Sequence, residues 1–478
     1  MDLTAAYDSQ AFREQGARIL ERLARHLDTS LAEEAPVLAS MTPEEALARV
    51  PAGFPERPQQ IAETFDGLLE DLLSASNHLH HPGYVGHQVA APLPLAALAE
   101  AVSALLNNGM AIFEMGQLQT AMEHRVLQFL AGRLGFGPEA GGVLTHGGSL
   151  GNLTALLAAR QRHAGHDVWT EGQREPLGVL VSEQAHYCVA RAAQVMGWGA
   201  AGALGVPVDA RFRMRPEALR EVHRRAADEG RRILAVVASS CTTATGSFDP
   251  IDEVAAYCEE HGLWLHVDGA HGASVALSPK HRGLLRGIER ADSVVWDLHK
   301  LMALPALNTA VLFRDGRRSY EAFAQEASYL FDDDAREDAW HQIGLRTLEC
   351  TKRGMGVTAY TLLRSLGTDV FVANIETQLA RARALAQRIE EAADFELAVA
   401  PQANIVCFRH VPAEPQAPDD LDALQLRLRR AVVSSGRFYL VTTGIHGATW
   451  LRTTMMNPLT TDAHLDRLLQ DLRDAAVR

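Results

Sequence analysis

Lys300 lies in an apolar stretch of the chain, where a lysine has few ordinary uses. In SVVWDLHKLMALP (293–305), an apolar run is interrupted at Asp297, His299 and Lys300 and then resumes. An ammonium group among apolar neighbours loses hydration, so such a lysine is paired with an acid, held neutral or committed to covalent chemistry. The ordinary alternative is a surface lysine whose stem covers apolar side chains. Residues elsewhere in the chain must decide between these uses.

A glycine-rich turn follows another apolar run. The segment VLTHGGSLGNLTALLAAR passes from a strand pattern through Gly148 and Ser149 into a helix pattern. Glycines allow the backbone to approach a ligand closely, and N–H groups at a helix start, together with a hydroxyl, can hold an anion. The same residues would also make an ordinary turn with serine as the helix cap. Phosphate binding is therefore one of two interpretations of this turn.

Two further polar residues follow apolar runs. Asp268 ends LWLHVD, and His186 comes shortly after LGVLVS. An unpaired carboxylate at the end of a buried strand would cost several kcal/mol, so Asp268 needs a partner. A structural salt bridge or a helix cap would also provide one, and a single histidine is most often a hydrogen-bonded structural residue. Neither residue indicates a function by itself.

The four features together match the needs of one cofactor, pyridoxal 5′-phosphate. This cofactor requires a lysine for its aldehyde, a carboxylate for its pyridine nitrogen, a flat side chain against its ring and a cradle for its phosphate. A charge-assisted hydrogen bond to the ring nitrogen contributes about 1.5–3 kcal/mol. We therefore predict that Lys300 serves covalent chemistry with this cofactor.

A mostly parallel sheet is the element that would bring these residues together. Between residue 85 and about residue 315, short apolar runs alternate with helix patterns, which is typical of a parallel sheet covered on both faces. Such α/β sheets bind ligands at the carboxyl ends of their strands. We expect a helical arm over 1–84, a large cofactor-binding α/β domain over 85–355 and a small α+β domain over 356–478.

Composition excludes several classes of protein. The 59 acidic and 45 basic side chains give a net charge of −14, which repels nucleic acid. No uncharged stretch is long enough to span a membrane, and the charged N-terminus does not resemble a signal peptide. Five scattered cysteines suit a reducing cytoplasm. We expect no metal site, because the histidines at 78–87 lack a matched carboxylate or cysteine and indicate a polar turn.

Five motifs, in their order along the chain, resemble those of a known family. They are SEQAH, SFDPIDEV, LWLHVDGAHG, ADSVVWDLHK and ASYLF. The chain is similar to the group II pyridoxal-phosphate-dependent amino acid decarboxylases, which act on glutamate, cysteine sulfinate or aromatic amino acids. The resemblance implies fold type I, the aspartate-aminotransferase-like fold, with a large, mostly parallel seven-stranded sheet. It also implies a homodimer with its active site at the subunit interface and a helical arm that packs on the partner.

The resemblance assigns roles to residues that hold the cofactor. Lys300 matches the lysine that binds the aldehyde, Asp268 the partner of the pyridine nitrogen, and His186 the residue that stacks on the ring. Ala270 matches the small residue on the other ring face. The remaining cofactor residues that the resemblance implies are Gly148, Ser149 and His299 at the phosphate, Thr243 near the ring hydroxyl, and Asp249 in a supporting position.

Other residues match positions that meet the substrate. Tyr329, in ASYLF, matches a loop tyrosine that delivers a proton to Cα after carbon dioxide leaves. Arg452 matches an arginine that binds a carboxylate, and a planar guanidinium suits that task. Tyr84 and His87 lie in HPGYVGHQ, a segment that we expect to line the side-chain pocket.

The implied reaction is the decarboxylation of an L-amino acid to an amine. The motifs are most similar to the branch that acts on acidic and sulfinic amino acids. The acidic run FDDDARED (331–338) could repel an anionic substrate, and the neutral character of HPGYVGHQ leaves diaminobutyrate-type or aromatic substrates open. An aminotransferase, a carbon–sulfur lyase, an aldehyde-forming enzyme and a non-enzymatic relative are further alternatives.

Overall fold

The computed structural model describes residues 3–57, 59–323, 340–414 and 416–477. The chain forms two compact units. The smaller unit contains residues 1–87, 387–398 and 407–478, and the larger contains 88–386 and 399–406. This division differs from the expected one, because the helical arm belongs with the C-terminal segment and residues 356–386 belong with the large sheet. In the part of the chain that the structure describes, no helix has the length and apolar character that crossing a membrane requires.

The larger unit is built on a seven-stranded sheet with the strand order β1-β7-β6-β5-β4-β2-β3. Its strands are β1 (Gly141–Thr145), β2 (Leu177–Ser182), β3 (Ala203–Val206), β4 (Arg232–Ser239), β5 (Trp264–Asp268), β6 (Ser293–Asp297) and β7 (Thr309–Phe313). The strands from β3 to β6 pair in parallel, and β7 pairs antiparallel with both β1 and β6. The predicted α/β class with a mostly parallel seven-stranded sheet is therefore confirmed.

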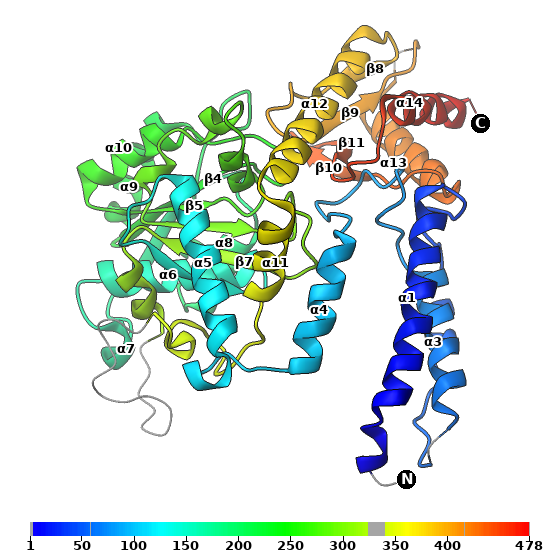
Figure 1. The fold of residues 1–478 in the computed structure, drawn as a ribbon. Helices are drawn as coiled ribbons and strands as arrows, with labels where there is room; N and C mark the ends of the chain where they lie inside the picture. The colour runs from blue at the N-terminus through cyan, green and yellow to red at the C-terminus, as the bar shows by residue number, and fades with distance from the viewer. Residues whose placement is uncertain (1–2, 58, 324–339, 415, 478) are drawn as a thin grey trace. The chain divides into compact units, whose positions relative to one another are not determined.

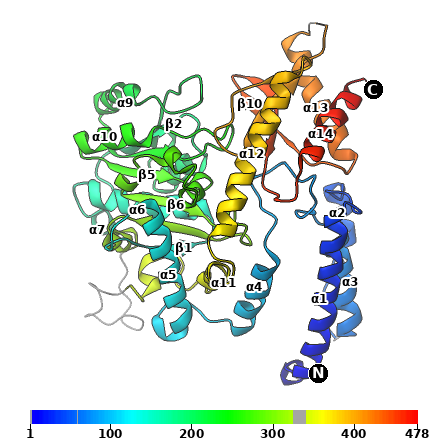
Figure 2. The same ribbon diagram turned by 45° about the horizontal axis from the view of Figure 1, so that its top comes forward.

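Burial explains why most of these strands are continuous apolar runs. Every residue of β2, β5, β6 and β7 is buried, as expected for strands covered on both faces. Helix α6 packs along β6 and β7, while α9 and α10 pack on β4 (Figures 1 and 2). The α-helices that begin in this unit are α4 (Pro94–Leu106), α5 (Gln117–Leu134), α6 (Gly148–His163), α7 (Val168–Glu171), α8 (Cys188–Val195), α9 (Pro216–Asp228), α10 (Ile251–His261), α11 (Gly356–Leu366) and α12 (Asp369–Glu391).

Short 3₁₀ helices make many of the connections in the larger unit. They are η2 (Phe113–Met115), η3 (Ala200–Gly202), η4 (Gly272–Leu277), η5 (Arg282–Leu285), η6 (Ile288–Arg290), η7 (Gly316–Ala322) and η8 (Ile343–Arg346). Helix η4 begins at Gly272, a short turn after β5 ends at Asp268. It therefore belongs to the loop region at the carboxyl edge of the sheet, where α/β proteins bind ligands.

The smaller unit combines helices with a four-stranded sheet of order β10-β11-β9-β8. Its elements are η1 (Leu3–Ala6), α1 (Ser9–Leu31), α2 (Pro43–Arg49), α3 (Ile61–Ala75), β8 (Phe395–Leu397), β9 (Ile405–His410), α13 (Pro418–Ser434), β10 (Val441–Ile445), β11 (Ala448–Thr454) and α14 (Asp462–Ala476). Thr42 and Glu45 form the capping box that starts α2. Helices α1 and α3 lie side by side (Figure 1), joined by an ion pair of 2.6 Å between Arg18 and Asp66.

A fully buried ion pair anchors β1 in the larger unit. Lys352 Nζ donates to both carboxylate oxygens of Glu123 at 2.7 Å, and neither side chain is exposed. Both residues also bind the backbone of Leu144: Lys352 donates to its carbonyl at 2.7 Å, and its N–H donates to Glu123 at 3.0 Å. The pair thus fixes the strand that leads into the glycine-rich turn.

We predict that Lys352→Met lowers the free energy of unfolding by about 3–5 kcal/mol, because it leaves the Glu123 carboxylate buried without its counter-ion. Urea unfolding of the full chain measures this. The double variant Glu123→Leu/Lys352→Met should lose less than the single variant, and Glu260→Gln, which breaks an exposed pair with Arg220, should change little. If the single and double variants lose the same free energy of unfolding, the loss does not come from an unpaired Glu123 carboxylate, and the prediction is wrong.

Candidate active site

A cavity that is partly open to solvent lies at the carboxyl ends of β4, β5 and β6. Ser239, Asp268 and Asp297 end these three strands, and all three residues line it. The structure brings seven of the predicted site residues together in this lining: Gly148, Ser149, His186, Thr243, Asp268, Ala270 and Lys300. The location is the one expected for a ligand site in an α/β sheet.

The glycine-rich turn forms one wall of the cavity. Gly147 has a φ of +96°, a conformation that favours glycine, and α6 begins at Gly148. A Cβ atom at Gly148 would lie 3.2 Å from both carboxylate oxygens of Asp297 and 3.4 Å from Cβ of Ala270. The space beside this backbone is therefore too tight for a side chain without some adjustment. With the Ser149 hydroxyl and the first N–H groups of α6, the turn fits a phosphate group.

Asp268 is buried at the end of β5, and the hydrogen-bond partners of its carboxylate are neutral groups. Its Oδ1 accepts a hydrogen bond from Ala270 N–H at 3.2 Å, and its Oδ2 lies 4.0 Å from the thiol of Cys188. Among the described residues, no cation forms an ion pair with it, so the structural salt bridge considered for this position is absent there. A buried carboxylate of this kind is ready to accept a cationic hydrogen-bond donor from a ligand.

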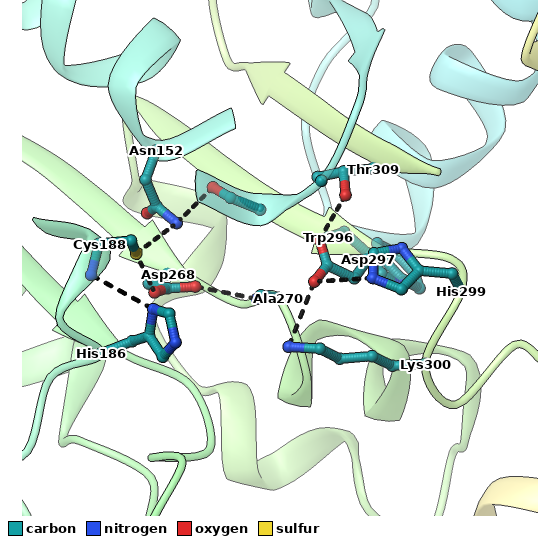
Figure 3. A network of polar contacts seen from close by, with 12 residues as sticks. Asn152, His186, Cys188, Asp268, Ala270, Trp296, Asp297, His299, Lys300 and Thr309 are labelled. Carbon is teal, nitrogen blue, oxygen red and sulfur yellow. Dashed lines mark hydrogen bonds and ion pairs between the residues drawn. The ribbon is translucent and has the colours of Figure 1, made fainter. Parts of the chain in front are cut away.

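His186 supplies a flat and neutral ring to the cavity. Its Nδ1 accepts a hydrogen bond from the backbone N–H of Cys188 at 3.3 Å. Burial lowers the pKa of His186, although the negative charge of Asp268 opposes this shift. The imidazole is therefore uncharged near neutral pH, and its flat ring can stack on an aromatic ligand. Figure 3 shows its position beside Asp268.

Lys300 is paired with an acid rather than surrounded only by apolar groups. Its Nζ lies 3.2 Å from Oδ2 of Asp297, and its side chain extends into the space toward His186 and Asp268 (Figure 3). Asp297 is itself held in place, because Thr309 Oγ1 donates to its Oδ1 at 2.6 Å and Nε2 of His299 lies 3.6 Å from its Oδ2. The ion pair keeps the amine in the cavity, where it can meet a ligand.

Two predicted cofactor residues lie just outside the lining. Both carboxylate oxygens of Asp249 accept backbone hydrogen bonds, from Met214 at 2.6 Å and from Ser239 at 2.7 Å, and burial raises the pKa of Asp249 to about 6. Asp249 thus supports Ser239, which lines the cavity. His299 Nδ1 lies 3.0 Å from the backbone carbonyl of Asn308, so its ring is held by the loop before β7.

Tyr84, His87 and Arg452 belong to the smaller unit. The rings of Tyr84 and Tyr439 stack with their centroids 5.1 Å apart, and the ring of His87 lies 5.7 Å from that of Tyr439. Burial lowers the pKa of His87, and the positive charges of Arg452 and Arg429 lower it further by smaller amounts. Tyr84 is buried, Tyr439 is partly buried and His87 is exposed, so these residues form an aromatic cluster at the surface of the unit, with the positive charges of Arg452 and Arg429 nearby. Tyr329 and the acidic run 331–338 lie outside the described residues.

Sequence reasoning missed several residues of the lining. Asn152 stands four residues after Gly148, so helix geometry places both on one face of α6. Cys188 follows His186 by two residues, and Thr242 precedes the predicted Thr243. The spacing of Asn152 was a usable signal, because residues i and i+4 of a helix are neighbours. Cysteine and threonine in apolar surroundings give no comparable signal.

Comparison with known proteins identifies the family. A family model described as "Pyridoxal-dependent decarboxylase conserved domain" matches residues 43–411. The chain belongs to the pyridoxal-dependent decarboxylase family. It is 33% identical to mouse cysteine sulfinic acid decarboxylase over 405 residues, which cover 82% of this chain and 81% of that protein. The mouse acidic amino acid decarboxylase GADL1 is 32% identical over 72% of this chain and 63% of its own length.

Other relatives extend the comparison. An L-2,4-diaminobutyrate decarboxylase of Rhizobium meliloti is 31% identical over 83% of this chain and 80% of its own length. The crystal structure of mouse CSAD superposes with a TM-score of 0.91 at 27% identity and covers 98% of this chain and 99% of that one. The protein is an amino acid decarboxylase that uses pyridoxal 5′-phosphate, as predicted.

The groups that line the cavity match the chemical groups of this cofactor. The turn at Gly148 and Ser149, where α6 begins, suits the phosphate. The buried Asp268 carboxylate suits a protonated ring nitrogen, and the neutral ring of His186 suits stacking. When bound, the cofactor supplies an electron-withdrawing ring that accepts the electrons of the bond that breaks. The amine of Lys300 lies in the same cavity as these three groups.

We predict that Gly148→Ala weakens the binding of pyridoxal 5′-phosphate about tenfold or more. The new Cβ must displace Asp297 or the turn by a few tenths of an ångström, and overpacking of this kind costs about 1–3 kcal/mol. Fluorescence titration of the cofactor-free protein measures the dissociation constant. Gly132→Ala is the control, because its Cβ meets nothing within 4 Å in the last turn of α5. If Gly148→Ala binds pyridoxal 5′-phosphate with unchanged affinity, the turn at Gly148 does not hold the phosphate.

Proposed function

We propose that the protein decarboxylates an acidic or sulfinic L-amino acid, of the aspartate, glutamate or cysteine sulfinate type, to its amine and carbon dioxide. The observation that carries this choice is the likeness, at 32–33% identity, to a cysteine sulfinic acid decarboxylase and an acidic amino acid decarboxylase. The positive charges of Arg452 and Arg429 near His87 in the smaller unit are consistent with a substrate that bears two acidic groups.

Arg452 is the proposed ligand of a substrate carboxylate. Only 5% of its surface is exposed, and it lies on β11 at the register position opposite Val441. A guanidinium can bind a carboxylate through two parallel hydrogen bonds, which gives both affinity and orientation. Arg429 adds a second positive charge near His87, while the lowered pKa of His87 keeps that ring neutral. Tyr84 would line the same side-chain pocket through its stacked ring.

We propose that different residues of the cavity bind and orient different parts of the cofactor. Gly148, Ser149 and the nearby His299 hold the phosphate, and Asp268 holds the proton on the pyridine nitrogen. His186 and Ala270 enclose the ring from its two faces. The remaining proposed roles belong to Lys300, whose amine binds the aldehyde carbon, to Thr243 near the ring hydroxyl, to Asp249 as the support of Ser239, and to Tyr329, which would deliver the proton to Cα.

Diaminobutyrate is the second candidate substrate. The supporting observation is the 31% identity to a diaminobutyrate decarboxylase over 83% of this chain. The neutral segment HPGYVGHQ, which contains Tyr84 and His87, also differs from the residues expected for a strictly acidic substrate. The two candidates differ in the charge of the side chain, so one assay separates them.

We predict that a panel of L-amino acids gives the highest kcat/KM with cysteine sulfinate, aspartate or glutamate. The panel also contains 2,4-diaminobutyrate and tryptophan, and the protein is supplied with pyridoxal 5′-phosphate. Chromatography of the amine and trapping of carbon dioxide measure the products. Preference for diaminobutyrate would support the second candidate. A keto acid or peroxide product, without the amine, would contradict decarboxylation itself.

Arg452→Lys should raise KM for the preferred acidic substrate by about tenfold or more, because an ammonium group replaces two parallel hydrogen bonds with one. Arg409→Lys is a matched control in the same small sheet, where Arg409 pairs with Glu396 at 2.7 Å. It should leave KM within about twofold. Equal effects of the two substitutions would contradict a substrate contact for Arg452.

We further propose that the protein is a cytoplasmic homodimer whose arm, residues 1–84, packs on the partner at an interfacial active site. Helix α3 exposes an apolar stripe of Phe65, Leu68 and Leu72, which are 43%, 50% and 64% exposed. The spacing of three and four residues places them on one face of the helix. A contiguous apolar face of this kind marks a protein interface. Five free cysteines are consistent with a reducing compartment.

Leu72→Glu should weaken the dimer about 100-fold or more, since two symmetric copies of the charge would enter the interface. Sedimentation equilibrium measures the dissociation constant. Val195→Glu, at a residue 66% exposed on α8, is a control of matched exposure and should leave the dimer intact. A dimer unaffected by Leu72→Glu would mean that the arm stripe is not buried in it.

A further inference from the structure

A chain of buried hydrogen bonds crosses the larger unit beneath the cofactor cavity. Trp264 Nε1 donates to Ser293 Oγ at 2.8 Å, and Ser293 Oγ lies 2.8 Å from Nδ1 of His266. The other ring nitrogen of His266, Nε2, lies 2.8 Å from Oδ1 of Asn152. His266 and Ser293 are completely buried, and Asn152 is 1% exposed. The chain therefore ends on Asn152, which belongs to α6 and lines the cavity.

The donors and acceptors of this chain can be assigned from chemistry alone. The carbonyl of Gly148 only accepts, so Asn152 must present its amide N–H to it, and the 2.8 Å contact fixes the orientation of the amide. Oδ1 of Asn152 then faces His266, which must donate from Nε2. Burial lowers the pKa of His266 to about 4, so the ring is neutral and its Nδ1 accepts from Ser293.

Asn152 connects two parts of the cavity wall. Its Nδ2 donates to the carbonyl of Gly148 at 2.8 Å and to Sγ of Cys188 at 3.5 Å. Burial raises the pKa of the Cys188 thiol, which therefore keeps its proton and can direct it toward Oδ2 of Asp268, 4.0 Å away. Figure 3 shows Asn152, Cys188 and Asp268 in this sequence of contacts.

We propose that Asn152 is a positioning residue that sets the glycine-rich turn at Gly148 and the carboxylate of Asp268 in a common geometry. The inference rests on the proposed roles of these two residues at the phosphate and at the ring nitrogen. One amide group, whose orientation is fixed from behind by His266, then determines the separation between the two ends of the cofactor site. A fully satisfied buried network of this kind is rigid, which is what a site of fixed length requires.

The simpler alternative is that Asn152 only stabilises α6. Its hydrogen bond to the carbonyl of Gly148, four residues earlier, would then stabilise the first turn of the helix and have no effect on the cofactor site. Thr154 provides a matched control for this alternative, because it is also 1% exposed on α6 and its Oγ1 donates to the carbonyl of Leu150, again four residues earlier, at 2.9 Å. Thr154 does not line the cavity.

The test compares Asn152→Leu with Thr154→Val by cofactor binding and absorption. The cofactor-free protein is titrated with pyridoxal 5′-phosphate and with pyridoxal, which lacks the phosphate, and the visible band of the bound cofactor is recorded. We expect Asn152→Leu to weaken both ligands by about tenfold, the effect of leaving buried polar groups unpaired, and to shift the band. Thr154→Val should alter neither affinity by more than about twofold.

Cys188 gives a second test that does not depend on Asn152→Leu folding. Cys188→Ser retains a donor and an acceptor and should retain the wild-type band. Cys188→Ala should shift the band and weaken pyridoxal, while the ratio of the two dissociation constants stays the same because the turn is intact. Since both positions act through one chain, the effects of Asn152→Leu and Cys188→Ala should not add in the double variant.

Several outcomes would overturn the inference. If Asn152→Leu weakens only the phosphorylated ligand and leaves the band unchanged, Asn152 serves the turn alone. If Thr154→Val has equal effects, the cause is helix stability. Asp268→Asn separates this inference from the proposed function: an unchanged band there would refute the role of Asp268 and the inference with it. A shifted band in Asp268→Asn, with unchanged bands in both Asn152→Leu and Cys188→Ala, would refute the positioning role alone.

Discussion

The buried carboxylate of Asp268 is the constraint around which the site is organised. Among the described residues the hydrogen-bond partners of its side chain are the backbone N–H of Ala270 and the thiol of Cys188, both neutral. A buried carboxylate without a counter-ion costs several kcal/mol, and a cationic donor brought by a ligand recovers much of that cost. The wall therefore favours a bound ring that carries a proton on its nitrogen. The nearby amine, Lys300, does not compete for this carboxylate, because Asp297 binds it at 3.2 Å.

The sequence was sufficient to predict the strands that are buried on both faces, but it did not predict the edge strand or the division of the chain into units. The apolar runs VLT, LGVLVS, LWLHVD and SVVW correspond to β1, β2, β5 and β6. Strand β3 was missed because it lies at the edge of the sheet and its first three residues are only partly buried or exposed. The division into units also differed from prediction. Residues 399–406 return to the larger unit after the chain has left it, and no change of composition marks such a return.

The site residues were predictable where one chemical requirement selects one residue type. Lys300, Asp268 and Gly148 fall into that class, since each follows an apolar run that ends at the same edge of the sheet. Asn152 and Cys188 do not, because their importance comes from hydrogen bonds to residues that are distant in sequence. The pairing of Lys300 with Asp297 could have been suspected from their spacing of three residues. The sequence alone left it as one of three possibilities.

Two kinds of buried polar group serve different purposes in the larger unit. The charged pair of Glu123 and Lys352 satisfies itself completely and holds β1. The groups beneath the cofactor cavity are neutral, and His266 shows why this matters. It lies two residues before Asp268 on β5, and the negative charge of Asp268 favours its protonation, yet burial lowers the pKa of His266 to about 4. If His266 were charged, it would provide Asp268 with a permanent cation. Because His266 stays neutral, it does not act as a counter-ion for Asp268, and a cationic group of the ligand can bind that carboxylate.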